Sequence, residues 1–239
     1  MKLSIIICTH NSEGNLIKTL DSILSQSADD FEVVIIDGDS NDGTVDILRE
    51  YEIKFEGKLR WISEKDNGIY EAMNKGVKMA KGEYLNVVGA GDWLEPEALE
   101  KAFECIEKNS YPQAVQGKLR VWDKDLKNSY LLQTFPDSLA TNPMQHPALY
   151  YKKDLHKKYG LYDESYRIVS DYLFCMKAFL LGKEKVVAFD GVVDNYVTDG
   201  ISSTDTQRCE KENFRARREL GLIPNRLMRF IYKRLNIKY

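Results

Sequence analysis

The chain has 239 residues and a formal net charge of −3, and its 43% hydrophobic and 30% charged residues are the ordinary balance of a soluble globular protein with a sizeable core. The slightly acidic charge argues against general binding to nucleic acids, whose phosphate backbones require a basic face. The four cysteines are scattered without a C-x-x-C pair, which argues against structural zinc and a disulfide framework and favours a reducing compartment.

The first segment, MKLSIIICTHN, is too short for the apolar core of a signal peptide, so we expect it to form a strand. No apolar run in the sequence approaches the roughly 18 residues that are needed to cross a bilayer. Together these observations predict a cytoplasmic protein.

Strands and helices are expected to alternate in the first part of the chain. The segments 3–8 and 31–37 are β-branched and apolar at nearly every position, as are strands buried on both faces of a parallel sheet. Between them, apolar residues at helical spacing predict a helix with Ser12 as its N-cap. Further strands are expected at 58–63 and 84–88, with helices after residue 44, over 69–80 and from Pro96. This alternation predicts βαβ units and a Rossmann-like parallel sheet.

The pattern changes after about residue 110. The segments 114–122 and 129–135 are expected to form antiparallel strands, and 146–160 a strand with a short helix. The segment 170–182 predicts a helix that Ser170 caps and Gly182 ends. Because no linker interrupts the chain, we expect one α/β domain over 1–205, with a mostly parallel central sheet in its first half (1–92) and a smaller antiparallel sheet in its second half (93–205).

The last part of the chain, 206–239, is expected to be a basic amphipathic helical tail. Leu227, Ile231 and Leu235 fall on one face and Arg226, Arg229 and Lys233 on another. This pattern suits shallow binding to an anionic membrane surface, and it equally suits a terminal helix packed on the domain with its basic side in water. Both interpretations stay open, so a peripheral location at the inner face of the cell membrane is an alternative to a wholly cytoplasmic one.

Polar residues follow each of the four strands expected in the first half, as THN (9–11), DGDSNDGT (37–44), EKDNG (64–68) and GAGD (89–92). Any one of these segments alone is typical of a turn or a helix cap. Ligands of open α/β sheets bind at the carboxyl ends of the strands, where these four segments would converge. The sequence therefore predicts a ligand-binding crevice at this edge of the sheet.

The ligand of this crevice is constrained by two missing motifs. The segment THNSEGN after the first strand does not supply G-x-G-x-x-G, and no P-loop is present. Phosphates are therefore not expected to bind a glycine-rich loop, which leaves a metal ion as the device that holds them. Acids after the second and third strands could hydrogen-bond a ribose or a base edge, and an acid after the fourth could hold the metal.

Four separate motifs, SIIICTHN, VVIIDGDSNDGT, SEKDNGIYEAMNKGVKMAKGEYLNVVGAGDW and YRIVSDYLF, together resemble the family 2 glycosyltransferases of the GT-A fold. The resemblance covers roughly residues 1 to 205 and is closest to enzymes that assemble bacterial capsule, O-antigen or exopolysaccharide. It implies a GT-A-like domain, a nucleotide-sugar donor that is most often UDP-linked, a divalent metal (Mg or Mn) and an inverting displacement. The half 1–92 would then bind the nucleotide and 93–205 the acceptor, a glycan or lipid-linked saccharide.

The resemblance also assigns roles to particular residues. Asp92 matches the last acid of the family's D-x-D-like segment and is the expected metal ligand, although GAGD stands where relatives often read NADD or DADD. The residues that match nucleotide-binding positions are Thr9, Asn11, Asp37, Asp42, Asp66, Asn67, Gly68 and Asn74, the last expected to face the site from its helix.

The single acid in GAGD can suffice because Mg²⁺ commonly takes one or two carboxylates together with substrate phosphates. What a single carboxylate loses is affinity for the metal when no nucleotide is present. We therefore expect the metal and the donor to bind together, with little metal held by the protein alone.

Three residues of the second half complete the expected site. Asp171 opens the helix 170–182, where a carboxylate is also favourable as a helix-dipole charge; the resemblance identifies it as the catalytic base that accepts a proton from the acceptor hydroxyl. His146 matches a histidine expected at the acceptor or diphosphate side, and Arg167 could pair with Asp171 or with an anionic substrate. Each also has a purely structural interpretation.

These observations predict an inverting, metal-dependent glycosyltransferase that moves a sugar onto a growing cell-surface glycan. A catalytically inactive nucleotide-sugar-binding scaffold of a glycan-assembly complex is the main alternative, and the glycines of GAGD keep it open. A sugar-phosphate nucleotidyltransferase would share the architecture, but it requires a Gly- and Arg-rich phosphate loop that CTHNSEGNL does not provide.

Overall fold

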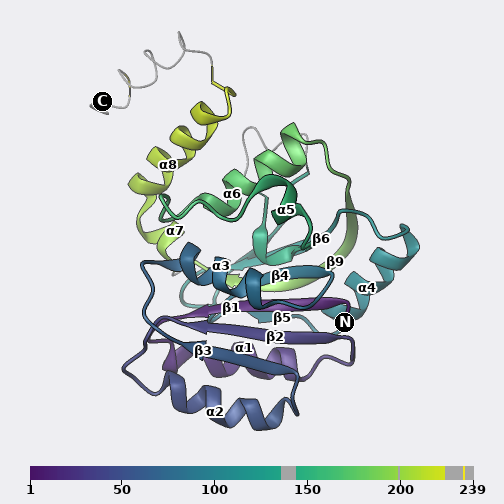
Figure 1. Cartoon of the computed structure of the whole chain (residues 1–239), viewed down its shortest axis with the longest axis vertical. Helices are drawn as coiled ribbons and strands as arrows, with labels where there is room; N and C mark the ends of the chain where they lie inside the picture. Colours follow the sequence, from purple (N-terminus) through teal and green to yellow (C-terminus); the bar gives the residue numbers. More distant parts are fainter. Residues whose placement is uncertain (136–143, 199, 224–233, 235–239) are drawn as a thin grey trace.

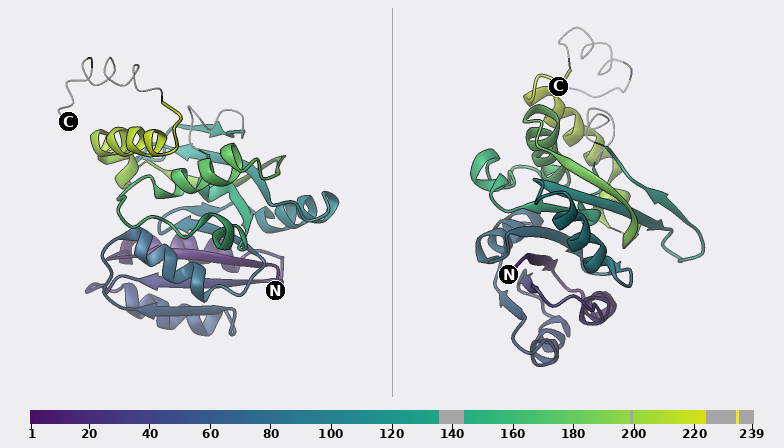
Figure 2. Two further views of the ribbon diagram at one scale, coloured as in Figure 1. Left: turned by 45° about the horizontal axis from the view of Figure 1, so that its top comes forward. Right: turned by 90° about the vertical axis from the view of Figure 1, so that its right-hand side faces the viewer.

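A computed structural model describes residues 1–135, 144–198, 200–223 and 234. The first half alternates as expected: β1 (Leu3–Thr9), α1 (Glu13–Leu24), β2 (Phe31–Asp37), α2 (Thr44–Lys54), β3 (Leu59–Ser63), α3 (Ile69–Met79) and β4 (Tyr84–Gly89). Strands β3, β2, β1 and β4 pair in this order and all in parallel. This half forms one end of the molecule (purple to blue in Figures 1 and 2) and the rest of the chain the other.

The second half adds short strands and helices to the same sheet. Its elements are β5 (Trp93–Leu94), α4 (Ala98–Lys108), β6 (Ala114–Trp122), β7 (Ser129–Leu132), the short helix η2 (His146–Ala148), β8 (Leu149–Lys152), α5 (Leu155–Tyr159), α6 (Ser170–Cys175), the π-helical turn η3 (Met176–Leu181), β9 (Val186–Val197), α7 (Ile201–Thr204) and α8 (Thr206–Glu219). The described strands form one sheet of order β3-β2-β1-β4-β8-β6-β9-β5, with β7 on β6.

The fold class predicted from the sequence is confirmed at the level of the sheet: the chain is a mixed α/β protein whose first half is a parallel sheet. The expected antiparallel pairing of β6 with β7 is present, and β8 pairs antiparallel with both β4 and β6. The antiparallel strands thus continue the parallel sheet through β8 and do not stand apart from it. The boundary drawn at residue 205 stays a prediction.

The core lies on both faces of the parallel strands, which explains their nearly continuous apolar sequence. Alternate residues point to opposite faces, so Ile6 and Val34 pack with residues of α3 while Ile5 and Val33 pack with residues of α1 and α2. The helices cover the two faces of the sheet and leave the ends of its strands to the loops.

Two helix starts differ from the sequence predictions. Helix α6 has Val169 at its N-cap, and Ser170 instead accepts a hydrogen bond from the backbone N–H of Asp163 through Oγ (2.6 Å). Helix α4 begins two residues beyond Pro96, because Glu97 adopts a left-handed conformation at its N-cap (φ 60°). A serine or proline marks the neighbourhood of a helix start, but the loop geometry decides the residue.

The C-terminal helix α8 packs against α6, beside which it lies in Figure 1. Ala216 of α8 is fully buried in the core on this side. The residues whose pattern suggested membrane binding, at positions 226, 227, 229, 231, 233 and 235, lie outside the described part of the chain. Within the described residues, the structure contains no helix that is both long and apolar enough to span a bilayer.

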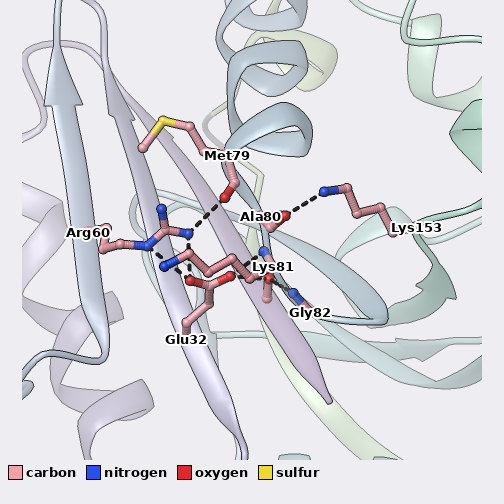
Figure 3. A network of polar contacts seen from close by, with 8 residues as sticks. Glu32, Arg60, Met79, Ala80, Lys81, Gly82 and Lys153 are labelled. Carbon is pink, nitrogen blue, oxygen red and sulfur yellow. Dashed lines mark hydrogen bonds and ion pairs between the residues drawn. The ribbon is translucent and has the colours of Figure 1, made fainter. Parts of the chain in front are cut away.

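A buried polar network closes the amino ends of the parallel strands, opposite the predicted crevice (Figure 3). The carboxylate of Glu32 in β2 accepts hydrogen bonds from Ser4 Oγ (2.7 Å), Arg60 Nη2 (2.6 Å) and the backbone N–H of Lys81 (2.5 Å). Arg60 also donates to Met79 O at the end of α3 (2.7 Å). The network joins β1, β2, β3 and the end of α3 by hydrogen bonds. It therefore fixes the amino ends of these strands relative to one another, at the end of the sheet opposite the crevice.

Candidate functional site

The four loops after the parallel strands converge as the sequence predicts. Thr9 lies opposite Asp37, Asp37 lies opposite Ser63, and Cys8 lies opposite Gly89 in the strand registers. The carboxyl ends of β1, β2, β3 and β4 therefore share one edge of the sheet. Any group bound there can contact several loops at once.

Asp37 organises this edge from within. Its side chain is fully buried and accepts hydrogen bonds from Thr9 Oγ1 (2.9 Å), Ser40 N (3.0 Å), Ser40 Oγ (2.5 Å) and Ser63 Oγ (2.6 Å). Burial opposes ionisation of this carboxyl, but the hydrogen bonds from Ser40, Ser63 and Thr9 outweigh it and lower the pKa of Asp37 below its ordinary value. Asp37 thus ties the first three strand ends together as a carboxylate.

Asn11 and Asp42 connect the first two loops. Asn11 has a left-handed backbone (φ 50°), donates from its backbone N–H to Ser40 Oγ (2.8 Å) and accepts from Asn41 N through Oδ1 (3.0 Å). The carboxylate of Asp42 accepts from the backbone N–H groups of Glu13 (3.1 Å) and Thr44 (3.0 Å), the first residues of α1 and α2. The structure therefore places Asp42 where it stabilises two helix starts.

The third loop approaches the second half of the chain. Asp66 is half-buried, accepts a hydrogen bond from Gly68 N (2.9 Å) and lies against Gly38. Gly68 has a positive φ of 139°, and a Cβ there would come within 2.5 Å of an Arg167 guanidinium nitrogen. Arg167 is exposed and donates to the backbone carbonyl of Asn67, so it pairs with this loop and not with Asp171.

Asn74 does not face the site as expected. It is 2% exposed, its Nδ2 donates to Tyr162 O (2.9 Å) and Glu164 Oε1 (2.8 Å), and its Oδ1 accepts from Tyr162 N (2.9 Å). These contacts use the whole amide to hold α3 against the segment after α5. The position of Asn74 on a helix could be predicted from the sequence, but its hydrogen bonds to the backbone of Tyr162 could not.

A cavity of about 410 Å³ opens beside these loops and brings three of the predicted residues together. Asp92 enters it from the loop after β4, His146 from η2 and Asp171 from α6. Thr9, Asp37 and Asp66 do not line this cavity, although the neighbouring residues Cys8 and Gly89 do. Much of its wall is apolar, as shown by Ile69, Met73, Leu119, Val121, Tyr130, Leu132, Met144, Ile168 and Val169.

Asp92 is held by the loop around it. It is 7% exposed, its Oδ1 accepts from Val197 N (3.2 Å), and its backbone carbonyl accepts from Thr19 Oγ1 of α1 (2.6 Å). Thr19 Oγ1 also accepts from Gly91 N (2.8 Å), and Gly91 has a positive φ of 114°. The glycine of the GAGD segment at 91 thus supplies a turn that delivers Asp92 to the cavity wall.

A second carboxyl, Asp194 of β9, lies near Asp92 and was not identified from the sequence. It is fully buried, and its Oδ1 accepts from Asn195 N (2.7 Å). Burial, and then the charge of Asp92, raise the pKa of Asp194 well above its ordinary value. Burial therefore favours the protonated form of Asp194.

Asp171 is half-buried and is held at the second position of α6. Its Oδ1 accepts a hydrogen bond from the hydroxyl of Tyr70 in α3 (2.8 Å). Burial and the charge of Asp171 raise the pKa of Tyr70 well above 10, so Tyr70 stays protonated and remains a donor. The second carboxylate oxygen of Asp171 is left for contacts toward the cavity that this residue lines.

The chain that leads into α6 is bound by a carboxylate of α8. Glu212 Oε2 accepts from the backbone N–H groups of Arg167 (3.1 Å), Ile168 (2.9 Å) and Val169 (3.3 Å), and Oε1 accepts from Arg167 N (3.0 Å). Cys209 and Asn213 of α8 also line the cavity. Glu212 and Tyr70 are distant in sequence from Asp171, and no local pattern identifies them.

His146 is 5% exposed, and its Nε2 lies 3.0 Å from the hydroxyl of Tyr162. That hydroxyl lies 2.6 Å from the hydroxyl of Tyr151, which lies 3.0 Å from Nε2 of His156. Burial lowers the pKa of both histidines, that of His156 to about 4. The predicted residue therefore begins a buried chain of neutral side chains that runs from the cavity into the core.

The residues present fit a metal ion only if a ligand brings most of the oxygens. In the described part of the chain, no three His, Cys, Asp or Glu side chains come together as a metal site. Asp92 and Asp171 are carboxylates that line the cavity, and the missing side chain at Gly89 provides the space that the Asp92 carboxylate occupies. A hard divalent cation that takes one carboxylate and the oxygens of a diphosphate is compatible with this arrangement.

Comparison with known proteins identifies one family. The model of glycosyl transferase family 2 matches residues 4–178. A PGL/p-HBAD biosynthesis glycosyltransferase of Mycobacterium bovis is 32% identical over 179 residues, which cover 74% of this chain and 69% of the relative.

Solved structures share the fold at lower identity. S. aureus TarS 1-349 in complex with UDP-GlcNAc has a TM-score of 0.70 at 24% identity, over 82% of this chain and 58% of that chain. The mannosyltransferase PcManGT of Pyrobaculum calidifontis, in complex with GDP-Man and Mn²⁺, has a TM-score of 0.72 at 16% identity, over 94% and 65%. These likenesses show that the architecture described above is that of GT-A glycosyltransferases.

Proposed function

The chain belongs to glycosyl transferase family 2, and we propose that it moves a sugar, with inversion, from a UDP-sugar to a hydroxyl of a growing cell-surface glycan. The observation that carries this proposal is that one cavity is lined by both Asp92 and Asp171. A transferase that uses a diphosphate leaving group requires one group near that leaving group and one base near the acceptor. Two carboxylates on separate elements of one cavity fit these two tasks.

The nucleoside would bind at the shared edge of β1, β2 and β3, in the half 1–92. Thr9, Asn11, Asp66, Asn67 and Gly68 offer hydroxyl, amide and carboxylate groups there, while Asp37 and Asp42 hold the loops in place from below. The complex of TarS with UDP-GlcNAc and the names of the relatives support a nucleotide-sugar donor. Uridine specificity itself is an expectation from the family.

Asp92 would hold a divalent metal together with the diphosphate. When bound, such an ion supplies positive charge that stabilises the developing negative charge of the leaving diphosphate. Asp92 itself would position this end of the donor at the cavity wall. The Mn²⁺ in the complex of PcManGT supports metal use in this fold.

Asp171 would act as the base. As the acceptor oxygen attacks the anomeric carbon and the bond to UDP breaks, the Asp171 carboxylate takes the hydroxyl proton. Tyr70 holds one carboxylate oxygen and so fixes the direction of the other. Attack on the face opposite UDP inverts the anomeric centre and needs no covalent intermediate, which agrees with a single base.

The acceptor would enter over the apolar wall contributed by the half 93–205. Tyr130 and Leu132 of β7 are 59% and 37% exposed and line the cavity, and from the first half Ile69 of α3, which is 41% exposed, adds to the same rim. Exposed apolar side chains at the rim favour an acceptor saccharide that carries an apolar group, such as a lipid-linked saccharide. A location at the inner face of the membrane would suit such an acceptor.

The scaffold alternative predicts nucleotide binding without transfer. Tyr70 holds the carboxylate of Asp171, and Glu212 holds the backbone that precedes α6. A protein that only binds the nucleotide-sugar does not require Asp171 to be positioned in this way. The deciding experiment is calorimetric titration of UDP with Mn²⁺ and with EDTA, for the wild type and Asp92→Ala, followed by UDP release from UDP-sugars. Metal-dependent UDP binding that Asp92→Ala abolishes, together with UDP release, supports the transferase. UDP binding that ignores both the metal and Asp92, without turnover, supports the scaffold.

A further inference from the structure

The hydrogen bonds that connect His146, Tyr162, Tyr151 and His156 all have a defined donor and acceptor, because the Gly160 carbonyl at the far end can only accept. His156 Nδ1 lies 3.1 Å from the backbone carbonyl of Gly160, which can only accept, so Nδ1 carries the proton. The ring of His156 is buried and neutral, so its Nε2 is bare and accepts from the hydroxyl of Tyr151. The ring is also stacked on Phe174, with centroids 4.3 Å apart, which holds it in this orientation.

The same argument continues to the cavity. Because the single hydroxyl proton of Tyr151 is used by His156, the contact of 2.6 Å between the two tyrosines requires Tyr162 to donate to Tyr151. The proton of Tyr162 is then used as well, so its oxygen accepts from Nε2 of His146. A neutral imidazole carries one proton, which leaves Nδ1 of His146 as a bare acceptor.

Nδ1 is the ring nitrogen that remains for the cavity. His146 lines the cavity, and among residues 1–135, 144–198 and 200–223 its ring hydrogen-bonds only Tyr162, through the other nitrogen. The backbone carbonyl of Gly160, at the far end of the hydrogen-bond chain, thus determines that His146 presents a bare acceptor nitrogen to the cavity. An acceptor nitrogen in a largely apolar wall discriminates strongly for ligands with a hydroxyl at that point.

We propose that His146 is a hydroxyl-binding residue, which the chain Gly160–His156–Tyr151–Tyr162 holds as the Nε2–H tautomer so that Nδ1 accepts a hydrogen bond from a substrate hydroxyl. The ligand chemistry is a sugar hydroxyl, which either the donor sugar or the acceptor saccharide can supply. The inference rests on the proposed transferase function, because that function brings sugars into this cavity beside Asp171.

The tautomer can be measured without turnover. The chain has three histidines, so long-range ¹H–¹⁵N correlation spectra of the labelled protein at pH 7 resolve each ring, and loss of one set in His146→Phe assigns it. We expect Nδ1 of His146 to appear as a bare nitrogen and Nε2 as a protonated one. A protonated Nδ1 at His146 overturns the inference. In Tyr162→Phe we expect a mixture of tautomers, whereas Tyr166→Phe, which removes a buried hydroxyl bound to Glu219, should leave the wild-type pattern.

Binding and kinetic measurements test the hydroxyl. The probes are UDP, UDP-glucose, UDP-GlcNAc and, as acceptor, octyl β-D-glucoside. For His146→Phe we expect unchanged UDP affinity and a loss of about tenfold in kcat/KM. Weaker binding of the UDP-sugar relative to UDP assigns the contact to the donor; a raised acceptor KM at unchanged donor affinity assigns it to the acceptor. Loss of UDP affinity itself, or kcat/KM equal to that of the wild type, overturns the proposal.

Asp171→Asn is measured in parallel to separate the two ideas. If Asp171→Asn retains full turnover, the assignment of the base fails, and the tautomer of His146 is still decided by the spectra. If Asp171→Asn is inactive and His146→Phe behaves as the wild type, the proposed function stands and the role of His146 is refuted.

Discussion

The carboxylate of Asp92 lies directly over Gly89: a Cβ at residue 89 would come within 2.5 Å of Asp92 Oδ2. The first glycine of GAGD is therefore more than the loss of an acid. It provides the space in which the remaining carboxylate lies. A side chain at 89 and the observed position of Asp92 exclude each other, which explains how a segment with a single acid can present that acid to the cavity.

Gly89→Ala should therefore displace Asp92. We expect the affinity for UDP in the presence of Mn²⁺ to fall by about tenfold, the order of one lost charge-assisted contact, while binding in EDTA does not change. Isothermal calorimetry measures both. Gly14→Ala is a matched control, because a Cβ at this helical glycine of α1 meets nothing within 4 Å. Equal metal-dependent affinity in Gly89→Ala and the wild type would show that Asp92 does not need its observed position.

Asp171→Asn removes the proposed base and keeps the shape of the side chain. General base catalysis typically contributes 10²–10⁴-fold, so we expect turnover to fall by about 10³-fold. The affinity for UDP should not change, because the Asp171 side chain accepts its hydrogen bond from Tyr70 of α3 and not from a nucleoside loop. Release of UDP measures turnover and calorimetry measures binding. If Asp171→Asn loses UDP affinity together with turnover, Asp171 is a structural residue of α6.

Glu212→Ala should release the chain that leads into α6. Three backbone N–H groups lose their common acceptor, so we expect kcat to fall by about tenfold, with UDP affinity unchanged, and hydrogen exchange over 167–175 to increase. Glu212→Gln should keep most of the activity, because its carbonyl oxygen can take the place of Oε2. Glu210→Ala, an exposed carboxylate of the same helix, is the control. Identical exchange and kcat in Glu212→Ala and Glu210→Ala would refute this role.

Glu32 predicts a pH dependence of stability that is separate from catalysis. Burial opposes its ionisation, but hydrogen bonds from Ser4, Lys81 and Arg60 and the charge of Arg60 lower its pKa below the ordinary 4.5. A lowered folded pKa stabilises the protein above pH 4.5, and this contribution is lost as the pH falls through the folded pKa.

Glu32→Gln should therefore lower the free energy of unfolding at pH 7 by about 3 kcal/mol, since it breaks a pair whose carboxylate is 2% exposed. The difference from the wild type should shrink as the pH falls below 4.5. Urea denaturation at pH 7, 5 and 4 measures it. Asp46→Asn, in an exposed pair with Arg49, should change stability little at any of these pH values. A constant difference between Glu32→Gln and the wild type from pH 7 to 4 would contradict the assignment.

The convergence of the four loops could be predicted because it depends only on local patterns. Continuous apolar strands such as 3–8 imply burial on both faces, and parallel strands carry their carboxyl ends to one edge. The placement of Asp92, His146 and Asp171 in one cavity agrees with this reasoning. The roles assigned to these residues remain predictions.

Contacts between distant parts of the chain could not be predicted. Asn74 lies on the expected helix, but Tyr162, 88 residues away, takes up its amide. The hydroxyl of Tyr70 reaches Asp171 across 101 residues, and Ser170 loses its expected role as a cap because Asp163 N binds it. The helical periodicity of the sequence predicts which face of a helix a residue occupies. It does not predict which other element packs against that face, and therefore does not predict the hydrogen-bond partner.

The attachment of α8 to the segment 167–169 has a consequence for recombining family members. Arg215 also donates to Ser165 Oγ (2.8 Å), and Tyr166 donates to Glu219 (2.8 Å), so α8 and the approach to α6 form one hydrogen-bonded unit. A chimera that joins the first half of this chain to an acceptor half from a relative should take that relative's α8 along with it. A junction at residue 205 would combine α6, which carries Asp171, with an α8 from another protein. A junction near residue 92 keeps α6 and α8 from the same protein.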